Sequence, residues 1–103
     1  VMGGQYQACG HVHLLSNLLE WDMDLQEAID FTRVFPDSDD PDDRVQVESA
    51  LPESVRNELE ALGHQTYIPV RPVGGAQAIW IDWENGVLRG ASDPRKDGSA
   101  IGY

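Results

Sequence analysis

Cys9, His11 and His13 have side chains that could bind a metal ion or act as a nucleophile and its base. We expect a helix here, and residues two positions apart on a helix point to different sides, so His11 and His13 do not converge on one ion. No acidic residue stands where it could orient a Cys9–His11 pair, so nothing activates the thiol. The sequence therefore predicts no metal site and no thiol nucleophile here, and Cys9 is expected to be a small buried residue.

The acidic run between Pro36 and Asp43 could suggest a calcium loop. It lacks the central glycine and the terminal bidentate glutamate that such a loop needs. Like charges repel along the run, and its prolines prevent regular hydrogen bonding. A solvated acidic loop is the favoured interpretation.

The segment Ser92–Arg95 has two interpretations. The guanidinium group of Arg95 could bind a substrate carboxylate through two hydrogen bonds. The favoured alternative is a tight turn in which Asp93 accepts hydrogen bonds from its own backbone and Arg95 ties down the C-terminus. Arg33, just before the acidic loop, is predicted to form a structural ion pair, and a site role for it stays open.

The charge of the chain limits its partners. Eighteen acidic residues against seven Lys and Arg give a net charge of -11, which repels nucleic acid and anionic membrane surfaces. No apolar run approaches the roughly 18 residues that span a bilayer. The single cysteine cannot form an internal disulfide, so it indicates no compartment. We expect any targeting signal to lie upstream, which leaves bacterial periplasm and cytoplasm both open.

Three helices are predicted from local signals. Apolar residues recur at three- and four-residue steps over Val12–Leu19, in a helix that begins near Gln5. Asp24 caps a second helix, which buries Leu25, Ala28 and Ile29. A third helix has Pro52 at its first position and ends at Gly63.

The predicted strands are rich in β-branched and aromatic residues. Asn85–Gly86 is a strong signal for a hairpin turn because both positions tolerate positive φ. The tail Gly90–Tyr103 is predicted to be turn-rich, and the strands after the third helix to form a meander. The result is an α+β layered fold. The predicted strands are Arg44–Glu48, Gln65–Val70, Gln77–Trp83 and Val87–Arg89.

Several segments, taken together in this order, resemble the C-terminal region of γ-glutamyltransferases. The most specific is the terminal Gly-Ala-Ser-Asp-Pro-Arg followed by Gly-x-Ala-x-Gly-Tyr. The resemblance runs from one end of the chain to the other. The segments are Met2–Gln5, Gly10–Val12, Ala28–Arg33, Leu62–His64, Gly75–Ile79 and Gly90–Tyr103.

The resemblance implies that residues 1–103 are a single C-terminal fragment of the small subunit of a self-cleaving N-terminal-nucleophile hydrolase. It implies part of an αββα sandwich, with mostly antiparallel strands and helices packed on one face. In that family a Thr at the start of the small subunit attacks a γ-glutamyl amide, and this Thr lies upstream of the chain. Gly3 and Gly4 match the pair whose backbone amides stabilise the oxyanion. The fragment alone is therefore expected to be inactive, and no cofactor is implied.

The implied partners are the rest of the small subunit, the large subunit, and a γ-glutamyl amide such as glutathione or another small amide. Members of the family usually carry Ser-Pro before the glycines, whereas this chain has Val1–Met2. This departure is typical of a divergent bacterial subgroup with acylase- or amidohydrolase-like members. A non-catalytic α+β interaction module is the alternative from a different class. We expect the isolated fragment to self-associate through open strand edges.

Overall fold

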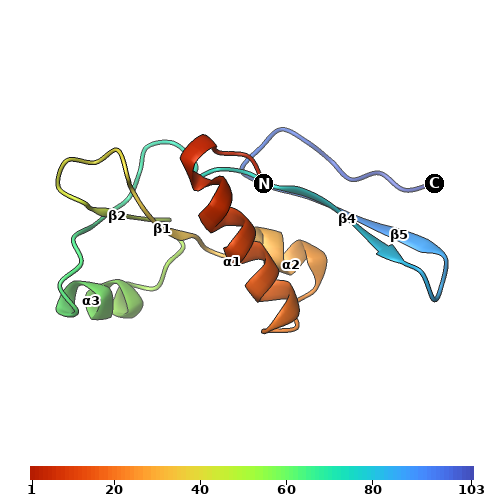
Figure 1. The fold of residues 1–103 in the computed structure, drawn as a ribbon, viewed down its shortest axis with the longest axis horizontal. Helices are drawn as coiled ribbons and strands as arrows, with labels where there is room; N and C mark the ends of the chain where they lie inside the picture. The colour runs from red at the N-terminus through yellow and green to blue at the C-terminus, as the bar shows by residue number, and fades with distance from the viewer. The chain divides into compact units, whose positions relative to one another are not determined.

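The computed structural model describes residues 1–103, which form two compact units: Val1–Phe31 together with Gly74–Tyr103, and Thr32–Val73. The fold is α+β, as predicted (Figure 1). No helix combines the length and the hydropathy needed to cross a bilayer. The first unit contains η1 (Gly4–Tyr6), α1 (Gln7–Leu19), α2 (Leu25–Asp30), β4 (Gln77–Asp82) and β5 (Val87–Ser92). The second contains β1 (Val34–Pro36), β2 (Val45–Val47), α3 (Glu53–Ala61) and β3 (Thr66–Tyr67).

The sheet of the first unit is an antiparallel hairpin of β4 and β5, paired from Gln77↔Ser92 to Asp82↔Val87. The hairpin is confirmed, but the prediction that the two residues Asn85–Gly86 alone form its turn is wrong. The connection spans residues 83–86, in which Gly86 has a φ of 65° while Asn85 stays at negative φ. Asp82 accepts hydrogen bonds from the backbone and side chain of Asn85, which shapes the longer loop. β5 also continues to Ser92, into the segment predicted to be turns.

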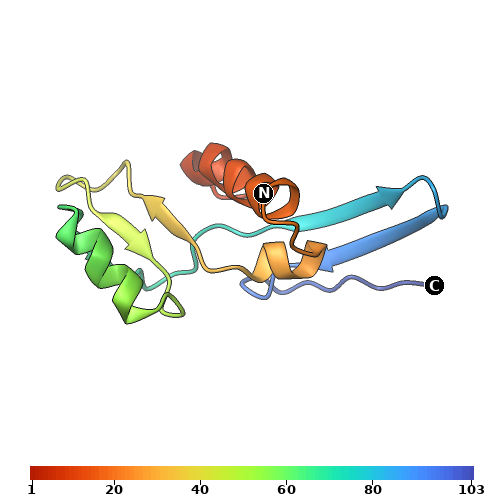
Figure 2. The ribbon, with the colours of Figure 1, turned by 90° about the horizontal axis from the view of Figure 1, so that it is seen from below.

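The core of the first unit lies where α2 packs against the hairpin (Figure 2). Ile29, Ala76 and Ala91 form this core and are at most 3% exposed. The cap predicted at Asp24 is present, because its carboxylate accepts a hydrogen bond from the N–H of Glu27 at 2.9 Å. Asp24 therefore fixes the start of the helix that closes the core.

The apolar face predicted for α1 is largely uncovered within this chain. Val12, Leu15 and Leu19 are 65%, 50% and 69% exposed. α1 does contact α2, where buried Asn17 donates a hydrogen bond to the carbonyl of Ala28 at 3.5 Å. An exposed apolar patch of this kind is typical of an interaction surface.

The second unit holds a three-stranded sheet in the order β1-β2-β3. β1 is antiparallel to β2, whereas β3 lies parallel to it with α3 between them in sequence. The predicted meander is therefore wrong, because β3 pairs with β2 and not with β4. The strand predicted over Gln65–Val70 has only two residues in the structure, Thr66 and Tyr67. β1 was not predicted at all.

The boundaries of α3 follow two backbone signals. Pro52, predicted to be the first helical residue, is the N-cap, and the helix begins one residue later at Glu53. At the other end Gly63 has a φ of 98°, and its N–H donates to the carbonyl of Glu60 at 3.0 Å. Gly63 is thus the left-handed cap that the sequence predicted.

Candidate functional site

Gly3 and Gly4 lie at the entrance to the first helix, in conformations that favour glycine. Gly3 has φ 145° and ψ 24°, and Gly4 has a φ of 57°. η1 begins at Gly4 and runs directly into α1. Residues with a side chain are strained at these φ values. This gives a structural reason for two adjacent glycines.

The carbonyl groups of this pair point into the helix. The N–H of Tyr6 donates to the carbonyl of Gly3 at 3.1 Å, and the N–H of Gln7 donates to that of Gly4. The amide N–H groups of Gly3 and Gly4 have no acceptor within the chain. The first N–H groups of a helix have no intrahelical partner, and the helix dipole favours negative charge near them. Two adjacent donors at this end can therefore bind an anionic oxygen.

The residues around the pair fix its position. Met2 and Gly75 form an isolated antiparallel bridge, in which Met2 donates to Gly75 at 2.7 Å and Gly75 to Met2 at 3.2 Å. A Cβ on Gly3 would lie 3.2 Å from the Cα of Gly74. Gly3 is therefore packed closely against the segment that leads into β4, whereas a Cβ on Gly4 would meet nothing within 4 Å.

Asp93 and Arg95 form the tight turn that was favoured from the sequence. The N–H of Arg95 donates to the carboxylate of Asp93 at 2.9 Å, and the N–H of Lys96 to its carbonyl at 3.0 Å. The guanidinium of Arg95 donates to Asp93 at 3.2 Å and to the carbonyls of Ile29 and Phe31 at 3.0 Å each. Arg95 therefore binds the carbonyl end of α2, whereas the sequence predicted that it ties down the C-terminus of the chain.

Arg33 is buried in the second unit, 4% exposed. Its guanidinium donates to the carbonyl of Val73 at 2.7 Å. Its backbone N–H donates to the carboxylate of Glu48 at 2.8 Å. These bonds connect the residue before β1 to Glu48, which follows β2, and to Val73, the last residue of the second unit.

The candidate metal ligands near the N-terminus do not converge. Nδ1 of His11 donates to the carbonyl of Gln7 at 2.7 Å, whereas the ring of His13 lies 6.0 Å from that of Phe31. No group of three or more His, Cys, Asp or Glu side chains in the structure could hold a metal ion. Cys9 is half-buried, which differs from the full burial expected.

The acidic run is an exposed loop, as predicted, and two of its carboxylates are bound by Arg44 and Tyr67. Arg44 binds Asp40 at 2.6 Å and lies 4.6 Å from the centre of the Tyr67 ring. The hydrogen bond from Arg44 lowers the pKa of Asp40 from 3.8 to about 2. The hydroxyl of Tyr67 donates to Asp37. The i, i+4 spacing of Asp40 and Arg44 was a signal for this pair that the sequence analysis missed.

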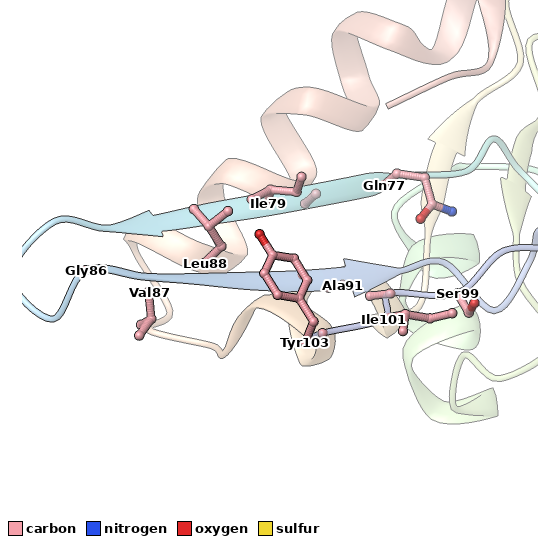
Figure 3. Close-up of a pocket in the computed structure, with 13 residues that line it drawn as sticks. Gln77, Ile79, Gly86, Val87, Leu88, Ala91, Ser99, Ile101 and Tyr103 are labelled. Atoms are coloured by element: carbon pink, nitrogen blue, oxygen red, sulfur yellow. The ribbon is translucent and has the colours of Figure 1, made fainter.

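An open hollow of about 1040 Å³ lies along one face of the β4–β5 hairpin and the tail that follows it. Figure 3 shows Ile79 and Leu88 from the strands, and Ile101 and Tyr103 from the tail, around it. Ile79, Leu88 and Ile101 are 70%, 66% and 86% exposed. The hollow brings together no nucleophile with a base, and apolar side chains from the strands and the tail make up about half of its lining.

Comparisons with known proteins agree on one family. The family model of γ-glutamyltranspeptidase matches residues 1–103. The glutathione hydrolase proenzyme of Bacillus subtilis (strain 168) is 31% identical over 84 residues, which are 82% of this chain and 14% of that protein. The acylase ACY 1 proenzyme of Pseudomonas sp. (strain V22) is 36% identical over 85 residues, with the same coverage. The chain thus spans about a seventh of the length of these curated relatives.

Solved structures share the fold. A cephalosporin acylase from Bacillus halodurans matches with a TM-score of 0.86 and 31% identity, over 100% of this chain and 20% of that one. A γ-glutamyltranspeptidase from Pseudomonas nitroreducens matches with a TM-score of 0.81 and 26% identity, over 93% of this chain and 49% of that one. The similarity therefore extends over both units of the chain.

Proposed function

Because the chain belongs to the γ-glutamyltranspeptidase family, we propose that it is a C-terminal fragment of the small subunit of a self-cleaving enzyme that hydrolyses or transfers amide-bound acyl groups. Gly3 and Gly4 stabilise the oxyanion in this proposal. The observation that supports it is that both amide N–H groups lie at the start of a helix without an acceptor in the chain. The rest of the small subunit and the large subunit complete the site.

The chemistry follows from the position of these donors. The hydroxyl of the Thr nucleophile, which lies outside residues 1–103, attacks the carbonyl carbon of the amide and loses its proton to a base. The carbonyl π electrons move to the oxygen, and the two N–H groups donate to the oxyanion. Collapse of the intermediate expels the amine, which takes up a proton. Water or an acceptor amine then releases the acyl group from Thr. The fragment without this nucleophilic Thr is inactive.

The leading substrate class is γ-glutamyl amides, including glutathione. It is supported by the match to a glutathione hydrolase proenzyme and by the family model over the whole chain. A second class, non-glutamyl acyl amides, is supported by the 36% identity to an acylase proenzyme and by the match to a cephalosporin acylase structure. Val1–Met2 before the glycines, where the family usually has Ser-Pro, favours this second class.

Expression of the full-length gene product tests the proposal. We expect denaturing gels to show self-cleavage into a large and a small subunit, and the small subunit to contain residues 1–103. The processed protein is then assayed with γ-glutamyl-p-nitroanilide and with acyl amides that lack the glutamyl group. Turnover of the first supports the γ-glutamyl class, and turnover of only the others supports the acylase class. If the protein neither cleaves itself nor turns over any of these amides, the proposed enzymatic function is ruled out.

A further inference from the structure

We infer that Asp93 is a positioning residue: its buried carboxylate fixes the Gly74–Ala76 segment, against which Gly3 packs, and so holds the Gly3–Gly4 amides in place. The inference rests on the proposed oxyanion role of those glycines. Asp93 is 0% exposed and is among the largest fully buried side chains of the structure. A buried carboxylate is stable only where hydrogen bonds compensate for its loss of water, so the donors around it show what it fixes.

The first contact leads towards β4. One carboxylate oxygen of Asp93 accepts a hydrogen bond from the N–H of Ala76 at 2.7 Å. The N–H of Asp93 donates in turn to the carbonyl of Ala76 at 3.1 Å. Asp93 thus holds both backbone groups of Ala76, and hydrogen bonds to a charged group are stronger than those between neutral groups.

The next contact leads to the glycines. Gly75 precedes Ala76 and exchanges two backbone hydrogen bonds with Met2, at 2.7 and 3.2 Å. Met2 precedes Gly3, which packs on Gly74 so closely that a Cβ on Gly3 would lie 3.2 Å from the Cα of Gly74. A continuous path of hydrogen bonds and covalent neighbours therefore joins the carboxylate to the amide donors.

The opposite side of the carboxylate is anchored to the core. The backbone N–H and the guanidinium of Arg95 donate to the other oxygen of Asp93 at 2.9 and 3.2 Å. The same guanidinium donates to the carbonyl of Ile29, a core residue of α2. Asp93 therefore connects the core of the first unit to the segment beside Gly3. Its role in this inference is to position the amide donors, and it does not contact the substrate.

A small displacement of this segment matters for catalysis. Oxyanion donors act at about 2.7–3.1 Å from the oxygen, and a misplacement of about 1 Å can cost on the order of 10²-fold in rate. Because the donors act mainly in the transition state, the loss falls on kcat and leaves KM nearly unchanged.

The test compares Asp93→Asn with Asp82→Asn in the full-length, processed protein. Asp82 is a matched control at the other end of the same hairpin. It also accepts hydrogen bonds from a backbone N–H and a guanidinium, from Asn85 at 3.0 Å and Arg89 at 2.8 Å, but it has no path to the glycines. Two readouts are measured: kcat and KM with the amide that the wild type turns over, and hydrogen exchange of the peptides that cover residues 1–8 and 73–78.

We expect Asp93→Asn to lower kcat by about tenfold or more, with KM within about twofold, and to speed exchange in both peptides. Asp82→Asn should change neither readout. Unchanged exchange in Asp93→Asn, or equal effects of the two variants, would overturn the inference. If the wild type turns over no amide, the proposed function fails, and the exchange measurement still decides the positioning role.

A second variant covers the case in which Asp93→Asn does not fold. Gly74 has a φ of 67°, so Gly74→Ala strains the segment beside Gly3 while leaving Asp93 intact. We expect the same loss of kcat and the same faster exchange. Full activity of Gly74→Ala would show that the path does not control the donors, and would overturn the inference as well.

Discussion

The side-chain amide of Gln26 binds both backbone groups of Ser92. Its nitrogen donates to the carbonyl of Ser92 at 2.9 Å, and its oxygen accepts from the N–H of Ser92 at 3.2 Å. This is the pattern that a residue of a neighbouring strand would offer. A glutamine on α2 therefore completes the hydrogen bonding at the end of β5, 66 residues later in the chain.

Gln26→Glu should destabilise the first unit. Glutamate keeps the acceptor for the N–H of Ser92 but cannot donate to its carbonyl, and its charge lies beside Asp30, to which Gln26 donates at 2.7 Å. We expect a loss of about 1 kcal/mol in the free energy of unfolding, measured by denaturant titration of the 103-residue chain. Gln65→Glu, at an exposed position, adds the same charge. Equal losses in the two variants would contradict a specific role for the Gln26 amide.

Elements with strong local signals could be predicted from the sequence. Asp24 caps α2 and Gly63 ends α3 through bonds to residues close in the sequence, so both boundaries could be predicted from single residues. β1 could not be predicted, because it has three residues, one of them Pro36, and exists only through its pairing with β2. The parallel pairing of β2 with β3 likewise depends on a crossover through α3, which no local pattern encodes.

The candidate site divides in the same way. The family resemblance singled out Gly3 and Gly4, and their positive φ gives a physical reason for two glycines. The bonds that lead to this pair are those of Gly75 to Met2 and of Asp93 to Ala76, from residues more than seventy positions further along the chain. Such long-range hydrogen bonds leave no spacing signal. For this reason the sequence predicted only a turn at Asp93, and its bond to Ala76 is visible only in the structure.

Gly3→Ala in the full-length protein should lower kcat by about 10²–10³-fold, the range for loss of one oxyanion donor. The added Cβ meets the backbone of Gly74 at 3.2 Å and strains a φ of 145°, so the amide must move. Gly86→Ala is the control, since it also places alanine at positive φ, but with nothing within 4 Å of the Cβ. Steady-state kinetics separate them, because Gly86→Ala should keep its kcat. Undiminished turnover in Gly3→Ala would exclude the oxyanion role.

The Asp40–Arg44 pair should make the acidic loop sensitive to acid. The bond from Arg44 lowers the pKa of Asp40 from 3.8 to about 2, so folding favours the ionised carboxylate. Its stabilising effect is complete above about pH 4 and is lost as the pH falls through about 2. Titration of the Asp40 carboxyl by NMR should give a midpoint near 2, and Arg44→Gln should return it towards 3.8. A wild-type midpoint near 3.8 would show that the pair does not form.

Self-association of the isolated chain should depend on the open face of the β4–β5 hairpin. Ile79 and Leu88 lie on that face and are 70% and 66% exposed. Exposed apolar strands tend to pack against further copies of a chain. We therefore expect the mass measured by light scattering to rise above the 11.4 kDa of one chain as the concentration increases.

Leu88→Glu should keep the isolated chain monomeric over the same concentration range, because a carboxylate on this face would lose its water on packing. Leu62→Glu is the matched control: Leu62 is 78% exposed, at the end of α3 in the second unit, and the change in charge is identical. If both variants became monomeric, added charge alone would explain the effect. If Leu88→Glu associated as the wild type does, the contact surface would have to lie elsewhere, and the exposed face of α1 is the next candidate, because Val12 and Leu19 are 65% and 69% exposed.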